Sequence, residues 1–219
     1  MLVAVVIGAT LGLSAPPAAA QPSAPSPSED GGSEFGPQVP PEPDAKSDAK
    51  PQSPEEEAAL RRARLDGLFA RLAQGDDPNW EKVQNEIWRV WSQSGSAAMD
   101  LLLVRAGRAM DSGDSELALR YLDDVVRLAP DFAEGWNKRA TVYFLLSDYG
   151  RSVADIERTL ALEPRHFGAL SGLGTILERV GDNKGAMRAY RRGLEVHPNL
   201  PGAAAGAERL APDVDGRKL

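Results

Sequence analysis

Cysteine is absent from this chain of 219 residues, and histidine occurs only twice. The lack of cysteine excludes disulfides, thiolate metal sites and a lipid-modified cysteine anchor. Neither His166 nor His197 has a second histidine four residues away, the spacing that places two imidazoles on one helix face. We therefore expect no metal site, and we expect both histidines to be solvated or capping residues at helix ends.

Positive charge is also in deficit, because 32 acidic residues against 25 basic ones give a formal net charge of −7. A nucleic-acid-binding surface needs a net basic face, so nucleic acid is not an expected partner. The basic clusters Arg61-Arg62 and Arg188, Arg191 and Arg192 are interpreted as solvated helix faces.

Signals for catalysis are missing as well. Gly172 and Gly174 begin like a dinucleotide-binding fingerprint, but Leu177 stands in place of the third glycine and no strand precedes them. No serine nucleophile stands in a recognisable pattern with a base and an orienting group. We expect no enzyme activity and no cofactor.

The first 20 residues carry no charged side chain, and their apolar run from Leu2 to Leu13 is too short for a comfortable membrane span. Ala18-x-Ala20 after this run is typical of a secretory signal cleaved between Ala20 and Gln21. No lysine or arginine precedes the run. We expect export and no membrane span after cleavage, with an uncleaved inner-membrane anchor as the alternative.

Residues 21–54 differ sharply in composition from the rest of the chain. They contain nine prolines, six serines and a single aromatic residue, Phe35, and six acids against Lys46 and Lys50 leave them net negative. Such a segment cannot bury enough apolar surface to offset the entropy lost on ordering. We predict a disordered, partly extended linker.

The rest of the chain is periodic. Pro130, Pro164 and Pro198 recur at intervals of 34 residues, and the segments before them can be overlaid residue by residue. Small residues fall eight positions into each unit, and large apolar residues recur at matching places; the aligned sets include Ala106, Ala140 and Gly174, Leu102, Trp136 and Leu170, and Leu122, Ile156 and Tyr190. A 34-residue period is the length of one helix–turn–helix unit in a stack of such units.

This pattern resembles the tetratricopeptide repeat (TPR) family, most clearly in Trp136-x6-Tyr143 and in Gly174…Pro198. The resemblance implies an all-α fold, an α-solenoid with two antiparallel helices per repeat and a concave groove. The repeats are expected at 99–132, 133–166 and 167–200, within a region of 97–210 that includes a capping helix.

Two helical segments flank the repeats. Trp88 lies 34 residues before Leu122, so the hairpin over 55–96 is interpreted as a degenerate repeat that covers the N-terminal end of the stack. The capping helix from Leu200 to Leu210 covers the other end. Residues 211–219 are expected to be a flexible tail.

Two helix starts are predicted from capping residues. Ser53 followed by Pro54 is typical of an N-cap with proline in the first turn. Asp131 precedes Glu134 by three residues, which predicts a reciprocal cap at the start of the second repeat. The repeat prolines are expected to end the helices before them.

The resemblance implies that the first helix of each repeat lines the groove. The implied groove residues are Leu103, Met110, Asp111, Asn137, Thr141, Phe144, Leu145, Ser171, Glu178 and Arg179. Family members that bind the C-terminal carboxylate of chaperones carry lysine and asparagine where this chain has Leu103 and Gly107, so that clamp is absent. The apolar strip suits an amphipathic helix or an extended peptide. The alternative is that some of these side chains are core, or are covered by the N-terminal hairpin.

Together these features predict an exported module that binds protein or peptide partners and scaffolds or assists cell-envelope proteins. The export signal and the composition favour a bacterial periplasm, and the chain is similar to small periplasmic repeat proteins linked to envelope integrity. The alternative is a regulatory subunit or inhibitor of a single envelope enzyme.

Overall fold

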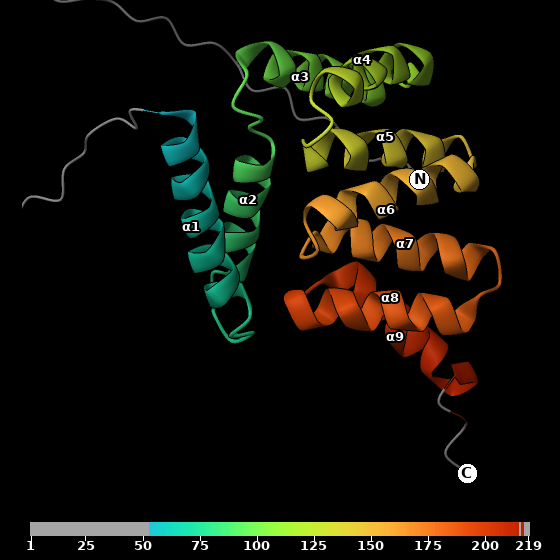
Figure 1. Cartoon of the computed structure of the whole chain (residues 1–219). Helices are drawn as coiled ribbons and strands as arrows, with labels where there is room; N and C mark the ends of the chain where they lie inside the picture. The colour runs from blue at the N-terminus through green and yellow to red at the C-terminus, as the bar shows by residue number, and fades with distance from the viewer. Residues whose placement is uncertain (1–52, 215, 217–219) are drawn as a thin grey trace, which may run out of the picture. The chain divides into compact units, whose positions relative to one another are not determined.

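The computed structural model describes residues 53–214 and Gly216, and its secondary structure is entirely helical in this part, as predicted (Figure 1). The described helices are α1 Pro54–Leu72, α2 Trp80–Trp91, α3 Ala97–Asp111, α4 Ser115–Leu128, α5 Ala133–Leu145, α6 Tyr149–Leu162, α7 Phe167–Arg179, α8 Asn183–Val196 and α9 Pro201–Val214. The predicted signal, its cleavage position at Ala20 and Gln21, and the linker up to residue 52 lie outside the described residues.

Three successive helix pairs carry the 34-residue period: α3 with α4, α5 with α6, and α7 with α8, each packed against the next pair. The second helices end two residues before Pro130, Pro164 and Pro198, as predicted. Each second helix begins at an aspartate whose carboxylate accepts the backbone N–H three residues on; these caps are Asp114, Asp148 and Asp182. The sequence period thus reappears as a repeated turn. At the start of α1, Ser53 caps the Glu56 N–H, also as predicted.

The eighth position of each repeat is small because neighbouring helices approach closely there. Ala106 and Ala140 are buried in the two earlier repeats. At Gly174 the ring of Tyr190 packs directly on the backbone, and a Cβ at this position would overlap it. Tyr190 is fully buried, and its hydroxyl donates to Glu178 Oε2 at 2.9 Å. The ring fills the volume that the missing side chain leaves.

Two glycines on α7 are expected to respond oppositely to alanine. A Cβ at Gly172 would lie 3.7 Å from Ile156 Cδ1, an ordinary contact, so Gly172→Ala is expected to raise the free energy of unfolding by about 0.5–1 kcal/mol. Gly174→Ala must displace Tyr190 and is expected to cost about 1–3 kcal/mol. Chemical denaturation of both variants measures the difference, and equal effects would contradict this helix register.

The N-terminal hairpin of α1 and α2 packs against the third repeat. Its apolar side chains share one core with Phe167 of α7 and with residues of α8 and α9. Arg165 donates to Asp66 of α1 at 2.7 Å, and the Asn199 amide donates to the Gly75 carbonyl at 2.7 Å. The prediction that this hairpin covers the first repeat is therefore wrong.

The charge on α2 gives a physical reason for this placement. Asp123 of α4 pairs with Arg139 of α5 at 2.8 Å across the junction of the first two repeats. The residue 34 positions before Asp123 is Arg89, and the residue 34 positions before Arg139 is Arg105. Stacking α2 on α3 in the repeat geometry would therefore bring two arginines together, which is unfavourable.

Aromatic rings fasten the hairpin to α7. Trp91 stacks on His166 with ring centroids 4.1 Å apart and planes 10° apart, and Trp88 meets Phe167 edge-on at 5.2 Å. A Cβ at Gly168 would lie 2.6 Å from the Trp88 ring, so α2 approaches the first turn of α7 closely. Ring stacking and edge contacts of this kind add to the burial of apolar area.

Both histidines are fully buried, so the expectation of solvated histidines is wrong. His166 does cap α7, because its Nδ1 accepts the Ala169 N–H at 3.1 Å. His197 lies edge-on to the Trp80 ring, and its Nε2 is 2.8 Å from Gln84 Oε1. Each ring closes a junction between the hairpin and the end of a repeat.

The buried His197 is expected to make stability depend on pH. Burial lowers the pKa of His197 below its ordinary value of 6.5, and the groups around the ring are Gln84, Trp80 and Phe167. As pH falls below 6.5, the unfolded chain binds a proton that the folded chain does not, so the free energy of unfolding decreases until the folded pKa is reached. His197→Gln should flatten this slope in denaturation curves from about pH 8 to 5. Identical slopes in both proteins would contradict the burial of this ring.

Glu134 does not form the predicted reciprocal cap with Asp131. Phe132 occupies the N-cap of α5, and no side chain caps this helix. Glu134 is 1% exposed, and its Oε2 lies 3.2 Å from His166 Nε2 and 2.9 Å from the Asn137 Nδ2 that donates to it. The carboxylate points into the junction with the next repeat because the buried His166 Nε2 lies there as its hydrogen-bond partner.

The C-terminal helix α9 covers the end of the third repeat and is longer than predicted. Ala203, Gly206 and Leu210 are buried against the α7–α8 pair, and Val214 packs at the edge of the same core. The expected flexible tail is therefore wrong for residues 211–214, which are helical. Residues 215 and 217–219 lie outside the described part.

Candidate functional site

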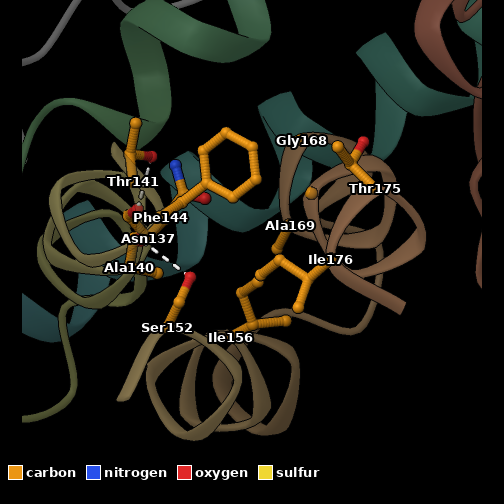
Figure 2. Close-up of a pocket in the computed structure, with 11 residues that line it drawn as sticks. Asn137, Ala140, Thr141, Phe144, Ser152, Ile156, Gly168, Ala169, Thr175 and Ile176 are labelled. Carbon is orange, nitrogen blue, oxygen red and sulfur yellow. Dashed lines mark hydrogen bonds between the residues drawn. The ribbon is translucent and has the colours of Figure 1, made fainter. Parts of the chain in front are cut away.

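A pocket of about 150 Å³ opens between α5 and α7, with α6 beneath it (Figure 2). Phe144 stands on the α5 side, and Ile156 and Ile176 lie close together at the opposite end. The lining residues are Asn137, Ala140, Thr141, Phe144, Ser152, Ile156, Gly168, Ala169, Gly172, Thr175 and Ile176.

Small residues create this hollow. Ala140 and Ala169 are buried at the facing surfaces of α5 and α7, and Gly172 presents no side chain at all. Protein interiors are normally filled to high density. Here the small residues leave a volume that Phe144 and Ile176 do not occupy, so the surface between the two helices is concave.

The hydroxyls of the lining are satisfied within the protein. Thr141 Oγ1 donates to the Asn137 carbonyl at 2.9 Å, and Ser152 Oγ donates to the Ala140 carbonyl at 2.8 Å. Thr175 bonds in the same way to the carbonyl four residues before it. The pocket wall is therefore mainly apolar.

Asn137 is the polar group that remains for a ligand. Its Nδ2 donates to Glu134 Oε2 at 2.9 Å, which orients the amide. Within the described residues its Oδ1 has no hydrogen-bond partner, so it can accept an N–H from a bound molecule. Glu134 is itself held by His166, on which Trp91 stacks, so one chain of contacts joins α2 to the pocket.

The rim of the pocket is positively charged at Arg179. Its guanidinium lies 5.1 Å from the Phe144 ring centroid and donates to the Tyr149 hydroxyl at 3.4 Å. Hydrogen bonds from Ser147 and then from Arg179 lower the pKa of Tyr149. Arg179 has no carboxylate partner in the part of the chain that the structure describes, so an incoming acidic group can pair with it.

The structure brings three of the residues implied by the family groove to the pocket: Asn137, Thr141 and Phe144. Arg179 joins them at the rim through Phe144. Leu145, the next residue along α5, is 61% exposed and does not line the pocket.

The other implied residues lie elsewhere. Leu103 is a correction, because it is 7% exposed in the core between α3 and α4, where a groove ligand cannot reach it. Met110 packs partly on the same core, and Asp111 is exposed at the end of α3. Glu178 is engaged by Arg209 of α9 at 2.7 Å, which lowers the pKa of its carboxyl. The Ser171 hydroxyl is not among the pocket atoms; the backbone carbonyl of this residue accepts from Thr175.

Sequence reasoning missed most of the pocket floor. The missed residues include Ala140, Ser152, Ile156, Ala169, Gly172 and Ile176. Three of them are alanine or glycine on facing helices, and that coincidence of small residues in neighbouring repeats was the available signal.

Within residues 53–214, no group of three or more acidic or histidine side chains is placed to hold a metal ion. No helix in this range is long and apolar enough to cross a membrane.

Comparison with known proteins identifies the repeats. A sequence profile described as tetratricopeptide repeat matches residues 103–154 and 146–204. A TPR repeat-containing protein of Rhizobium etli is 40% identical over 156 residues, which are 71% of this chain and 76% of that protein. The chain belongs to the tetratricopeptide repeat family. The small glutamine-rich tetratricopeptide repeat-containing protein 2 of Saccharomyces cerevisiae is 27% identical to this TPR protein over 53% of the chain and 33% of the yeast protein.

Solved TPR structures share the fold. The Arabidopsis OM64 TPR domain superposes with a TM-score of 0.52 at 18% identity, covering 53% of this chain and 97% of that domain. The first TPR domain of Spaghetti (RPAP3), bound to an HSP90 peptide, superposes with a TM-score of 0.51 at 20% identity. The match covers 52% of this chain and 91% of that domain. The chain therefore has the α-solenoid fold of TPR domains.

Proposed function

We propose that this TPR protein binds an extended segment of a partner protein by seating one apolar side chain between α5 and α7. The observation that carries the proposal is the pocket of about 150 Å³, which is apolar in its floor and has Asn137 as its polar group. Helix-lined apolar hollows of this kind are used to anchor single side chains of peptides.

The size of the pocket favours a single side chain over a larger ligand. Sites for drug-sized molecules and cofactors occupy about 300–1,000 Å³, whereas a cavity of about 150 Å³ admits a group as large as benzene. The pocket here matches the smaller class. A leucine, isoleucine, methionine or phenylalanine of the partner fits this volume.

The polar atoms around the pocket favour a segment with a nearby acidic residue. The free Oδ1 of Asn137 accepts a backbone N–H of the partner, and Arg179 pairs with a carboxylate beside the apolar anchor. A solved structure of the same fold holds an HSP90 peptide, which supports peptide binding in general. The absence of lysine and asparagine at Leu103 and Gly107 argues against a chaperone tail as the partner here.

We further propose that the protein is exported and that its partner is a cell-envelope protein. The support is the uncharged segment of residues 1–20 and the small residues Ala18 and Ala20 before Gln21. Mass spectrometry of the protein recovered from cells tests this, because export predicts a mature chain that begins at Gln21. A chain that keeps residues 1–20 would favour the anchored form instead.

Selection of random displayed peptides on the purified chain tests the pocket. We expect the selected peptides to share one branched aliphatic or aromatic residue with an acidic neighbour. Gly172→Leu places a side chain in the pocket, from a position where the Cβ itself fits, and should abolish their binding while the protein stays folded. Arg179→Ala should weaken the binding of the selected peptides.

The matched control is Arg188→Leu, a change to the same residue at an exposed position of α8. It should leave binding unchanged. Peptides that bind the Gly172→Leu variant as well as the wild type would show that the pocket is not the binding site.

A further inference from the structure

Among the described helices, none is stacked on the face of α3 that begins the series of repeats (Figure 1). Leu101 and Val104 on this face are 50% and 51% exposed, and Arg105 and Arg108 beside them are also exposed. The hairpin of α1 and α2, which precedes α3 in the chain, packs on the third repeat instead.

In the second and third repeats, the corresponding face of the first helix is covered by the second helix of the preceding repeat. The residues of α5 that correspond to Leu101 and Arg108 are Gly135 and Val142, and both are buried against the first repeat. A Cβ at Gly135 would lie 2.6 Å from Val125 Cγ1 of α4. The corresponding face of α7 is buried in the same way, through Ala169 and Ile176, against Ile156 of α6. This face of a first helix therefore packs against a preceding second helix wherever one is present.

Charge specifies the occupant further. Arg139 of α5 is held by Asp123 of the preceding helix at 2.8 Å and by Asp155 of its own repeat at 2.8 Å. In the described part of the chain its equivalent Arg105 has neither partner. The position of Asp155 is taken by Tyr121, and none of the described helices precedes α3 in the stack. Within the described residues, Arg105 and Arg108 form no ion pair.

We propose that this α3 face docks an amphipathic helix of a partner protein that carries a carboxylate opposite Arg105 and small or apolar residues opposite Leu101 and Val104. The partner helix takes the place that α4 takes on α5, and its carboxylate takes the role of Asp123. The site is separate from the α5–α7 pocket, and its occupant is a helix and not an extended segment. Leu101 is larger than Gly135, which holds the equivalent position in the second repeat. The partner helix therefore has a small residue at the position that Val125 holds in α4.

The probe is a helix-constrained peptide with the sequence of α4, Ser115–Leu128, and the change Val125→Ala to admit Leu101. Its binding to the full chain is measured by fluorescence anisotropy. We expect Arg105→Glu to weaken binding about tenfold or more, and a second peptide that also carries Asp123→Lys to prefer the Arg105→Glu protein. Arg188→Glu on α8 is the matched control and should change neither affinity.

Each other outcome contradicts the proposal. Absence of binding to the wild-type chain, or equal binding to the Arg105→Glu variant, would show that the face is a solvated end of the stack. Loss of binding in Gly172→Leu with retention in Arg105→Glu would place the peptide in the α5–α7 pocket and would leave the proposed function of that pocket intact. Self-association of the chain that Arg105→Glu abolishes would identify a second copy as the occupant.

Discussion

Replacing Arg139 with leucine is expected to lower the free energy of unfolding by about 3–5 kcal/mol. Arg139 donates to both oxygens of Asp155 at 2.8 Å, and these bonds are the chief cause that raises the pKa of the guanidinium. Asp155 is 4% exposed. Removing the arginine leaves a buried carboxylate without its cation, whereas the Asp123 that it also binds remains in water. Urea denaturation of the variant measures the loss.

Two controls separate the buried charge from the loss of packing. Arg105→Leu makes the same change at the equivalent, exposed position of the first repeat, and should alter stability by no more than about 0.5 kcal/mol. The double variant Arg139→Leu with Asp155→Leu removes both charges and should recover most of the loss, because apolar residues often replace a buried ion pair without penalty. A double variant as unstable as Arg139→Leu alone would contradict this explanation.

Replacing Trp91 with alanine is the second large effect, and we expect a cost of about 3–5 kcal/mol. Trp91 is buried where the hairpin meets the third repeat, and its ring contacts His166, Phe167 and Phe69. The lost area and the cavity left behind both destabilise the junction. Thermal and chemical unfolding followed by far-ultraviolet circular dichroism measure the change for the whole chain.

Leu60→Ala is the matched control, because Leu60 lies on the same hairpin but is 54% exposed. It should change stability by about 0.5 kcal/mol or less. If Trp91→Ala melts the hairpin in a separate early transition and leaves the repeats at their wild-type midpoint, then the hairpin and the repeats are not one cooperative unit. That result would contradict the shared core described above.

The repeats could be predicted from the sequence because their contacts are local and periodic. The spacing of Pro130, Pro164 and Pro198 fixes where the second helices end, and the small residues at the eighth positions mark the helix crossings. Each unit packs on its neighbour in the same way, so one correct register determines all three.

The hairpin could not be placed in this way, because its position depends on contacts between residues far apart in the chain. Trp91 meets His166, and Gln84 meets His197 across 113 positions. Nothing in the period of 34 encodes these pairings. The same holds for Glu134, whose partner His166 belongs to the junction with the next repeat. The family resemblance favoured stacking of the hairpin on the first repeat. Its side chains instead fit the third repeat, and the charge of Arg89 disfavours stacking on α3.

Part of the lining of the candidate pocket was predicted, whereas its role in binding stays a prediction. The family register pointed to Asn137, Thr141 and Phe144, since these positions face the same side of α5 in any such repeat. It misplaced Leu103, because a groove position in the first repeat becomes core where α3 packs on α4. The floor of the pocket was missed because a cavity arises from the volumes of several helices together, which one helix face does not reveal.

The most direct test of the central proposal is photo-crosslinking in intact cells from position 141, where the exposed Thr141 at the pocket wall is replaced by a photoreactive amino acid. We expect a discrete crosslinked partner that disappears in the Gly172→Leu background, while crosslinks from exposed position 188 on α8 are unchanged. A partner that still crosslinks when the pocket is filled would show that the binding surface lies elsewhere than between α5 and α7.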